Sequence, residues 1–282
     1  MDRVFLPLIF EQRLFTDIYE LDTVIQDTVS TLTRVCLYKN KKTFELIIIK
    51  IMPDYDITYK ELHISDFVNK ILRDEYKLYV FVESYGYVLQ PQPYKDFLPE
   101  GVDENEYFIY LAIEYVPFSL MDANITLDDL TSIILELLAT LYIARRNTAF
   151  HHGDIHTGNI MLDKADYERQ YKIGDNVYTT KCNWMPRLID FGKNSSHNKI
   201  ITLTSDLRSV IGIISDITNA ESGLLELYRK WSSKLQWKSH LRQFGEDSSG
   251  NYLIISEVLL DDVFQKFRER LIKRTRLKNN IW

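Results

Sequence analysis

Two carboxylates and one amide in the second half of the sequence have the chemistry to hold a magnesium ion beside an attacking hydroxyl group. Asp154 is followed five positions later by Asn159, and Asp190 ends an apolar run that precedes Phe191-Gly192. Carboxylate and amide oxygens are the ligands that the hard cation Mg²⁺ prefers, so Asn159 and Asp190 are the candidate metal ligands. Asp154 is the candidate base, because a carboxylate can accept the proton of a hydroxyl group that attacks a phosphate.

The order of these residues resembles that of protein kinases. The segment from His152 to Asn159 is similar to the kinase catalytic loop, H-x-D-x-x-x-x-N, in which the aspartate is the base. Asp190-Phe191-Gly192 resembles the kinase element whose aspartate bridges the metal ion to the phosphates and whose glycine lets the backbone turn. The resemblance implies ATP and Mg²⁺ as cofactors, and a role for His152 in orienting the loop by hydrogen bonding.

Lys50 lies inside the apolar, β-branched run Leu46–Met52, which predicts a strand. A lysine in a buried strand is costly unless its ammonium group has partners. Kinases use such a lysine to hold the α- and β-phosphates and pair it with a carboxylate of the following helix, and the resemblance gives this role to Lys50. Glu61, near the start of that helix, is the first choice for the carboxylate, and Glu75 is the alternative.

The resemblance also implies a two-lobed α+β fold. An antiparallel sheet with one helix would form the N-lobe over residues 1–116, and a mainly helical C-lobe would follow over residues 117–282. The two lobes would meet at a hinge whose backbone N–H and C=O groups contact adenine. Glu114 and Val116 are therefore assigned to nucleotide binding.

The stretch Leu127–Leu162 narrows the resemblance to haspin-type Ser/Thr kinases. His156 stands where most Ser/Thr kinases carry a lysine and the haspin type carries a histidine, and we count it with the catalytic residues. The 31 positions from Asn159 to Asp190 exceed the short hairpin of most kinases. Haspin-type kinases also enlarge this hairpin, and residues 167–186 would form the insertion here.

Two further features predict a kinase that does not depend on phosphorylation of an activation loop. Asp206 resembles the aspartate that braces the catalytic loop, and only 16 positions separate it from Asp190, without an Ala-Pro-Glu motif. Gly153 replaces the arginine that usually reads a phosphorylated loop. The resemblance implies a protein substrate with a serine or threonine acceptor, and a basic or histone-like tail is one such substrate.

Two other functions remain open. The segment Asp22–Val35, where a kinase has its phosphate lid, contains no glycine, although glycines let backbone N–H groups approach phosphates closely. A lid of Asp27–Thr31 would have to supply hydroxyl and amide groups instead, so a pseudokinase that binds partners is one alternative. A small-molecule kinase of the aminoglycoside or choline type is the other, because His-Gly-Asp-x-His-x-Gly-Asn also resembles those enzymes.

Hydrophobic periodicity predicts the elements that would position these residues. Besides the run that contains Lys50, strands are expected over Tyr76–Leu89 and Tyr107–Val116. A cap of the Thr-x-x-Asp type at Thr126 begins the long apolar helix that leads to the catalytic loop. Further helices are expected over Tyr59–Leu72, Asp206–Thr218 and Ser256–Lys278.

Composition limits the compartment and the partners. The chain has 282 residues, a formal charge of −6 and two cysteines. The charge argues against direct binding of nucleic acid, and no apolar stretch reaches the roughly 18 residues of a membrane span. Cys36 and Cys182 give no disulfide framework, which favours an intracellular protein, cytoplasmic or nuclear. We expect a monomer that is not attached to a membrane.

Overall fold

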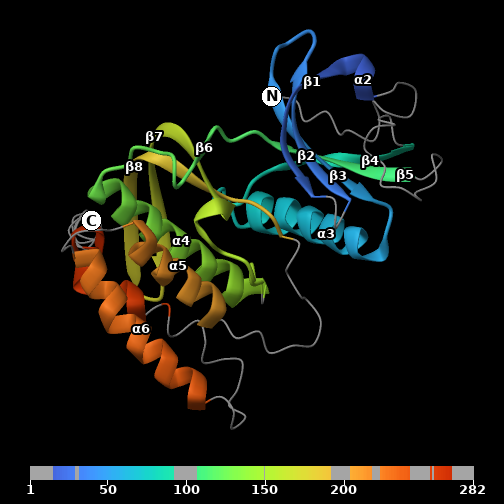
Figure 1. Cartoon of the computed structure of the whole chain (residues 1–282). Helices are drawn as coiled ribbons and strands as arrows, with labels where there is room; N and C mark the ends of the chain where they lie inside the picture. Colours follow the sequence, from blue (N-terminus) through green and yellow to red (C-terminus); the bar gives the residue numbers. More distant parts are fainter. Residues whose placement is uncertain are drawn as a thin grey trace, which may run out of the picture. The chain divides into compact units, whose positions relative to one another are not determined.

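Apolar, β-branched segments form an antiparallel sheet of five strands in the first part of the chain (Figure 1). Ile47, Ile49 and Ile51 of the central strand β3 are buried together on one face of the sheet. A short helix, α2 (Phe15–Ile18), precedes the first strand. The strands are β1 (Tyr19–Thr28), β2 (Thr33–Asn40), β3 (Leu46–Pro53), β4 (Ser84–Pro91) and β5 (Tyr107–Glu114), in the spatial order β1-β2-β3-β5-β4.

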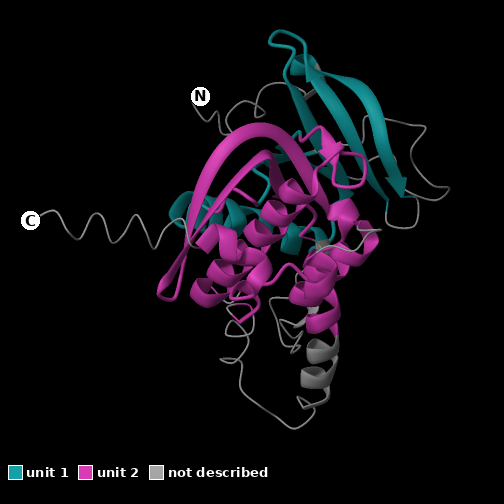
Figure 2. Ribbon diagram, turned by 90° about the vertical axis from the view of Figure 1, so that its left-hand side faces the viewer, with its two compact units in different colours: residues 1–77, 81–115 teal, residues 78–80, 116–282 magenta. Residues whose placement is uncertain are grey.

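The computed structural model describes residues 15–28, 32–91, 107–148, 150–191, 204–217, 223–241, 255 and 257–268. The chain divides into two compact units (Figure 2). Unit 1 comprises Met1–Lys77 and Phe81–Tyr115, and unit 2 comprises Leu78–Val80 and Val116–Trp282. The sequence predicts an N-lobe that ends one residue later, at Val116, and does not set Leu78–Val80 apart.

Helix α3 (Asp56–Phe67) continues without a break into the π-helix η2 (Val68–Glu75). Leu62 of α3 packs against buried side chains of β3 and β5. The π-helices of proteins are mostly single turns, frequently at functional sites, so the eight residues of η2 are unusual. A helix is thus present over the whole predicted range Tyr59–Leu72, with a change of winding from Val68 onward.

The strand expected over Tyr76–Leu89 is shorter than predicted, because β4 begins only at Ser84. Val80, Phe81 and Val82 are buried in succession, which a strand that points alternate side chains to opposite faces does not allow when one face is solvated. The guanidinium group of Arg73 donates to the carbonyl of Phe81, so a side chain occupies an acceptor in this stretch. The first half of the predicted strand is therefore wrong, and these residues form an irregular connection.

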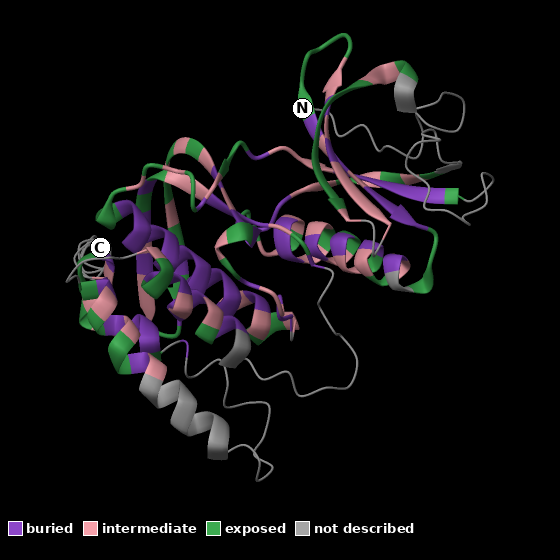
Figure 3. Ribbon diagram, viewed as in Figure 1, coloured by how far each residue is buried: buried purple, intermediate pink, exposed green. Residues whose placement is uncertain are grey.

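Unit 2 is built around helix α4 (Leu127–Thr148), which is buried on every side from Asp129 to Tyr142 (Figure 3). The Thr126 hydroxyl accepts a hydrogen bond from the backbone N–H of Asp129 at 3.1 Å and donates to the Asp129 carboxylate at 2.7 Å. The cap that the sequence predicts at this helix is confirmed.

In the part of unit 2 that the structure describes, a long β-hairpin and further helices accompany α4. The strands β6 (Phe118–Ser119), β7 (Ile160–Ile173) and β8 (Asn176–Leu188) form a second antiparallel sheet, and the β7–β8 hairpin contains the insertion expected over residues 167–186. The helices are α5 (Thr204–Ile217) and α6 (Gly223–Leu241), and two short 3-10 segments are η4 (Thr157–Asn159) and η7 (Asp262–Phe264).

The helix expected over Ser256–Lys278 is not continuous in the part that the structure describes. Asp261 is extended, with φ −61° and ψ 150°, and η7 follows it. The Asp261 carboxylate accepts from the Lys230 ammonium group at 2.6 Å and from the Trp231 indole N–H at 3.2 Å, which holds the chain out of helical geometry here. Residues 269–278 of the predicted helix lie outside the described residues.

The predicted α+β class is confirmed by this combination of antiparallel sheets and helices. A search for helices of sufficient length and apolar character to cross a membrane finds none among the described residues.

Candidate active site

The loop between α4 and η4 carries the candidate base, and a carboxylate of α5 fixes its backbone. Asp206, in the first turn of α5, accepts from the backbone N–H of His152 at 2.7 Å and from that of Gly153 at 2.8 Å. Gly153 has a φ of 85°, a conformation that glycine adopts at little cost. Because Asp206 binds two successive N–H groups, a single buried side chain fixes the backbone of the turn that precedes Asp154.

The buried imidazole of His152 links this loop to the residues that precede Asp190. Its Nε2 lies 3.0 Å from the carbonyl oxygen of Ile189, and its Nδ1 accepts from the backbone N–H of Asp154 at 3.3 Å. Burial lowers the pKa of His152 and outweighs the nearby carboxylates, so the ring is neutral and Nε2 carries its proton. The ring also meets Phe191 edge to face, with centroids 5.4 Å apart. His152 orients the loop in this arrangement.

The structure brings Asp154, Asn159 and the backbone next to Asp190 together within unit 2. The side-chain Nδ2 of Asn159 donates to the carbonyl oxygen of Asp154 at 2.9 Å and lies 3.5 Å from its carboxylate. The backbone N–H of Ile189 donates to the carbonyl of Asn159 at 3.1 Å. Since Nδ2 is bound to Asp154, Oδ1 is the Asn159 atom that would coordinate a metal ion, and an amide oxygen is a donor type that suits Mg²⁺.

His156 lies at the edge of this group of residues. Its side chain is 55% exposed, its Nδ1 accepts from the backbone N–H of Gly158 at 3.1 Å, and its Nε2 is 3.9 Å from a carboxylate oxygen of Asp154. That distance is too long for a direct hydrogen bond. The histidine therefore caps η4 and adds a polar group beside the candidate base.

In unit 1, Lys50 of β3 forms an ion pair with Glu61 of α3. The ammonium nitrogen lies 2.6 Å from Oε1 of the carboxylate, and the two side chains are 15% and 12% exposed. Glu75, the alternative partner, is exposed at the C-terminal end of η2. A short, largely buried pair of this kind holds the lysine in one position.

The two residues assigned to the hinge fall in different units. Glu114 ends β5, and its backbone N–H donates to the carbonyl of Glu83 at 2.8 Å. The N–H of Glu114 is therefore engaged within unit 1. Val116 is 5% exposed and opens the long segment of unit 2.

Two predicted features lie partly outside the described residues. Gly192 of the Asp-Phe-Gly element is one, and residues 29–31 of the expected lid are the other. Within the described part of the lid, Asp27 of β1 pairs with Arg34 of β2 at 2.6 Å.

Sequence reasoning missed a buried carboxylate, Glu136, on α4. It is 0% exposed and accepts from Arg169 at 2.7 Å, from the Tyr171 hydroxyl at 2.8 Å and from the Tyr167 hydroxyl. Burial raises the pKa of Glu136, and Arg169 opposes that rise. A signal was present, because Glu136 interrupts a long apolar helix and its three partners alternate along β7.

Comparisons with known proteins give short or distant matches. No protein-family model matches the chain. A curated protein of Invertebrate iridescent virus 3, named "Probable kinase 098L", is 36% identical over 75 residues, which make up 27% of this chain and 14% of that protein. The chain therefore matches only a small part of that relative's length. A solved structure of a kinase domain aligns with a TM-score of 0.45 at 17% identity, covering 71% of this chain and 62% of that chain.

Proposed function

We propose that this chain is an ATP- and Mg²⁺-dependent protein kinase that phosphorylates serine or threonine. The observation that carries the proposal is a circuit of hydrogen bonds in unit 2. Asp206 fixes the loop backbone, the His152 imidazole bonds to Ile189, and the Ile189 N–H bonds back to Asn159. The circuit joins three segments that are distant in sequence, and it supports one site made by the candidate base and both candidate metal ligands.

The proposed reaction is transfer of the γ-phosphoryl group. The acceptor hydroxyl oxygen bonds to the γ-phosphorus, the bond to the β–γ bridging oxygen breaks so that ADP leaves, and Asp154 accepts the hydroxyl proton. Asn159 and Asp190 would hold Mg²⁺, which when bound offsets the negative charge of the phosphates. Lys50 would bind the α- and β-phosphates while Glu61 keeps its ammonium group in place.

The haspin-like features refine the proposal. Gly153, in place of an arginine, donates its backbone N–H to Asp206. With 16 positions from Asp190 to Asp206, there is little room for a phosphorylated loop. We therefore expect activity without loop phosphorylation. A basic or histone-like tail is the proposed protein substrate, and His156 is placed to contact it beside Asp154.

One observation favours a second candidate, a pseudokinase that binds partners. The expected lid segment Asp22–Val35 contains no glycine. Its carboxylate at Asp27 is paired with Arg34, so this hairpin offers phosphates fewer unpaired donors than a glycine-rich lid would. Retention of Lys50, Asp154 and Asp190 weighs against this candidate.

The experiment that tests the proposal uses labelled ATP, Mg²⁺ and a library of serine- and threonine-containing peptides. Label in peptides from the wild type, with a loss of about 10³-fold in Asp154→Asn, is the expected result, because an amide cannot accept the proton. ATP binding by Asp154→Asn should stay within about twofold, since an amide keeps the size of the carboxyl group. A thermal shift with ATP but no transfer favours the pseudokinase, and no ATP binding at all contradicts the kinase.

A further inference from the structure

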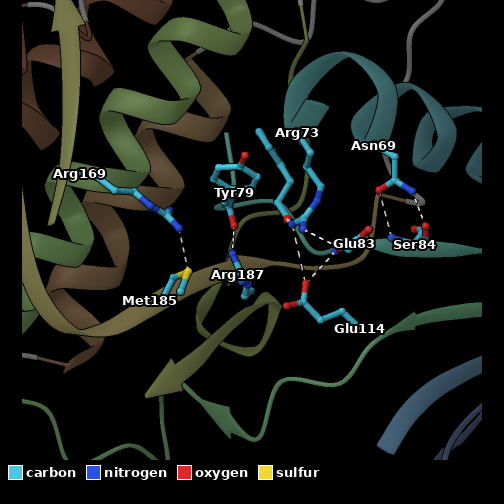
Figure 4. A network of polar contacts seen from close by, with 10 residues as sticks. Asn69, Arg73, Tyr79, Glu83, Ser84, Glu114, Arg169, Met185 and Arg187 are labelled. Atoms are coloured by element: carbon cyan, nitrogen blue, oxygen red, sulfur yellow. Dashed lines mark hydrogen bonds and ion pairs between the residues drawn. The ribbon is translucent and has the colours of Figure 1, made fainter. Parts of the chain in front are cut away.

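An arginine of the π-helix η2 lies at the centre of a polar network within unit 1 (Figure 4). The Arg73 guanidinium group is 3.0 Å from Oε2 of Glu83 and 3.8 Å from Oε2 of Glu114, and it also donates to the carbonyl of Phe81. Its side chain is only 7% exposed. A guanidinium group is costly to bury unless its donors are satisfied, so these acceptors determine where Arg73 and the helix that carries it can lie.

The two carboxylates that receive Arg73 are also joined to each other through the backbone. The N–H of Glu114 donates to the carbonyl of Glu83 at 2.8 Å, and the N–H of Glu83 donates to the Glu114 carboxylate at 3.0 Å. The side chain and the backbone N–H of Glu114 are therefore both engaged in contacts within unit 1. With its N–H engaged, a contact between the Glu114 backbone and adenine would have to use the carbonyl.

A second side chain of η2 attaches the helix to the same stretch of chain. Asn69 donates through its amide to the carbonyl of Ser84 and accepts from the Ser84 N–H at 3.1 Å. In Figure 4, Arg73 points toward Glu83 and Asn69 points toward Ser84. Two attachments four positions apart fix the rotation of η2 about its own axis as well as its distance from β4.

The rotation of η2 matters because the Lys50–Glu61 pair depends on the same helix. Glu61 lies in α3, and α3 runs directly into η2. If η2 turned about its axis, α3 would turn with it and the Glu61 carboxylate would leave the Lys50 ammonium group, which it now meets at 2.6 Å. The winding of η2 differs from that of an α-helix, so sequence periodicity alone does not set this rotation.

We propose that Arg73 is a positioning residue for the nucleotide: it holds the Glu61 helix and the Glu114 end of the hinge on one common support. The inference rests on the proposed function, because it concerns the binding of ATP by these two parts. An arginine suits the position better than a lysine, since one planar group with several fixed donors can reach three acceptors at once.

The test measures ATP affinity and thermal unfolding of the full chain for Arg73→Met, Arg73→Lys and the control Lys70→Met. Lys70 lies one turn away on η2, and its ion pair with Asp66 is exposed on both sides. Arg73→Met should raise the Kd for ATP about tenfold, the lower end of the effect of removing a group that orients a binding residue. Arg73→Lys should lie between Arg73→Met and the wild type, and Lys70→Met should match the wild type.

A double-mutant cycle separates positioning from general stability. If Arg73 acts through Glu61, the variant Arg73→Met/Glu61→Gln should bind ATP no more weakly than Glu61→Gln alone. A second variant guards against a general loss of stability in Arg73→Met. Glu114→Gln leaves Arg73 in place, weakens its ion pair with Glu114 and should also raise the Kd for ATP.

Two results would overturn the inference while leaving the proposed function intact. One is ATP binding by Arg73→Met within twofold of the wild type. The other is a double variant whose loss of binding free energy equals the sum of the losses in Arg73→Met and Glu61→Gln. A wild-type chain that binds no ATP removes the proposed function and this inference together, so the two failures are distinguishable.

Discussion

Asp190 carries its carboxylate on a backbone conformation that few residues other than glycine adopt. Its φ of 61° lies in the left-handed region, where aspartate and asparagine are tolerated better than most side chains. Such a conformation persists when the surroundings hold it in place. Here the preceding residue, Ile189, is held on both sides, because its N–H donates to Asn159 and its carbonyl accepts from His152.

The backbone of Asp190 decides which substitution tests it cleanly. Asp190→Asn keeps the tolerance for positive φ and removes the charge, so the free energy of unfolding should change little. The Mg²⁺ concentration needed for half-maximal ATP binding should rise by about tenfold or more, since one ligand loses its charge. Titration of Mg²⁺ at fixed ATP measures the effect.

Asp166→Asn, which changes an exposed carboxylate of β7, is the matched control. An unchanged Mg²⁺ requirement in Asp190→Asn would remove Asp190 from the proposed metal site.

Residue types and spacing were sufficient to find some parts of the candidate site and insufficient for others. Asp154 and Asn159 come from one loop, and their spacing is visible along the sequence. The pairing of Lys50 with Glu61 could be expected because a buried cation in a strand needs a carboxylate. Arg73 could not be found this way, since its acceptors belong to a stretch predicted as a regular strand and its helix departs from the α-helical period.

Helix α4 depends on its first turn, where Asp129 is held by several donors. Burial alone would raise the pKa of Asp129, but hydrogen bonds from Thr126, from Cys182 and from the backbone outweigh burial and hold the pKa below the ordinary 3.8. The folded carboxyl group therefore binds its proton more weakly than the unfolded one. Its contribution to stability is present above pH 3.8 and is lost as the pH falls through the lower, folded pKa.

Thr126→Ala should lower the free energy of unfolding by about 1 kcal/mol near neutral pH, because it removes the cap of α4. The difference from the wild type should shrink as the pH falls below 3.8, since a protonated Asp129 is a weaker acceptor for the Thr126 hydroxyl. Denaturant unfolding at several pH values measures both effects. A difference that grows on acidification would contradict this account of the cap.

The β7–β8 hairpin is attached to α4 by the buried Glu136 network. Glu136→Ala should lower the free energy of unfolding by about 3 kcal/mol, because it leaves the Arg169 guanidinium without its buried counter-charge. Glu168→Ala, which changes an exposed residue of the same strand, should cost less than about 0.5 kcal/mol. Equal losses in the two variants would show that the network does not hold the hairpin.

The elements were predictable where one period governed a whole segment. The strand over Leu46–Met52 and the capped helix after Thr126 have clear strand and helix patterns, and both are present. Residues 76–83 are rich in aromatic and β-branched side chains, but arginine side chains and buried contacts set their path. The break at Asp261 depends on Lys230 and Trp231, which are some thirty residues earlier in the chain and leave no local signal.

At the scale of the whole molecule, the chain crosses between the two units more than once, and these crossings determine which residues share a unit. The chain passes between the units after Lys77, Val80 and Tyr115. The short middle passage is tied into unit 2, where the carbonyl of Val80 accepts from the Leu188 N–H at 2.6 Å and the carbonyl of Tyr79 accepts from Arg187. The residues proposed for ATP binding are therefore divided between the two units, and Lys50 and Glu61 belong to unit 1.

The proposed independence from loop phosphorylation is a property of the whole enzyme and can be tested on it. Turnover of the purified chain should be the same, within about twofold, before and after treatment with a broad phosphatase. Position 153 is a glycine, so it has no arginine side chain that could bind a phosphorylated residue. Mass spectrometry of the treated chain confirms that it carries no phosphate. Loss of turnover that ATP preincubation restores would contradict the proposal.

The turn between β7 and β8 offers a place to lengthen the chain without disturbing the chemistry. The residues that flank the candidate metal ligands are paired at the near end of the hairpin, where Ile160 faces Leu188. At the far end, Gly174 has a φ of 59°, and a side chain added there would meet nothing within 4 Å. A fluorescent domain inserted at this turn should therefore leave the spacing of Asn159 and Asp190 unchanged, so the tip of the hairpin is a suitable insertion site for a reporter.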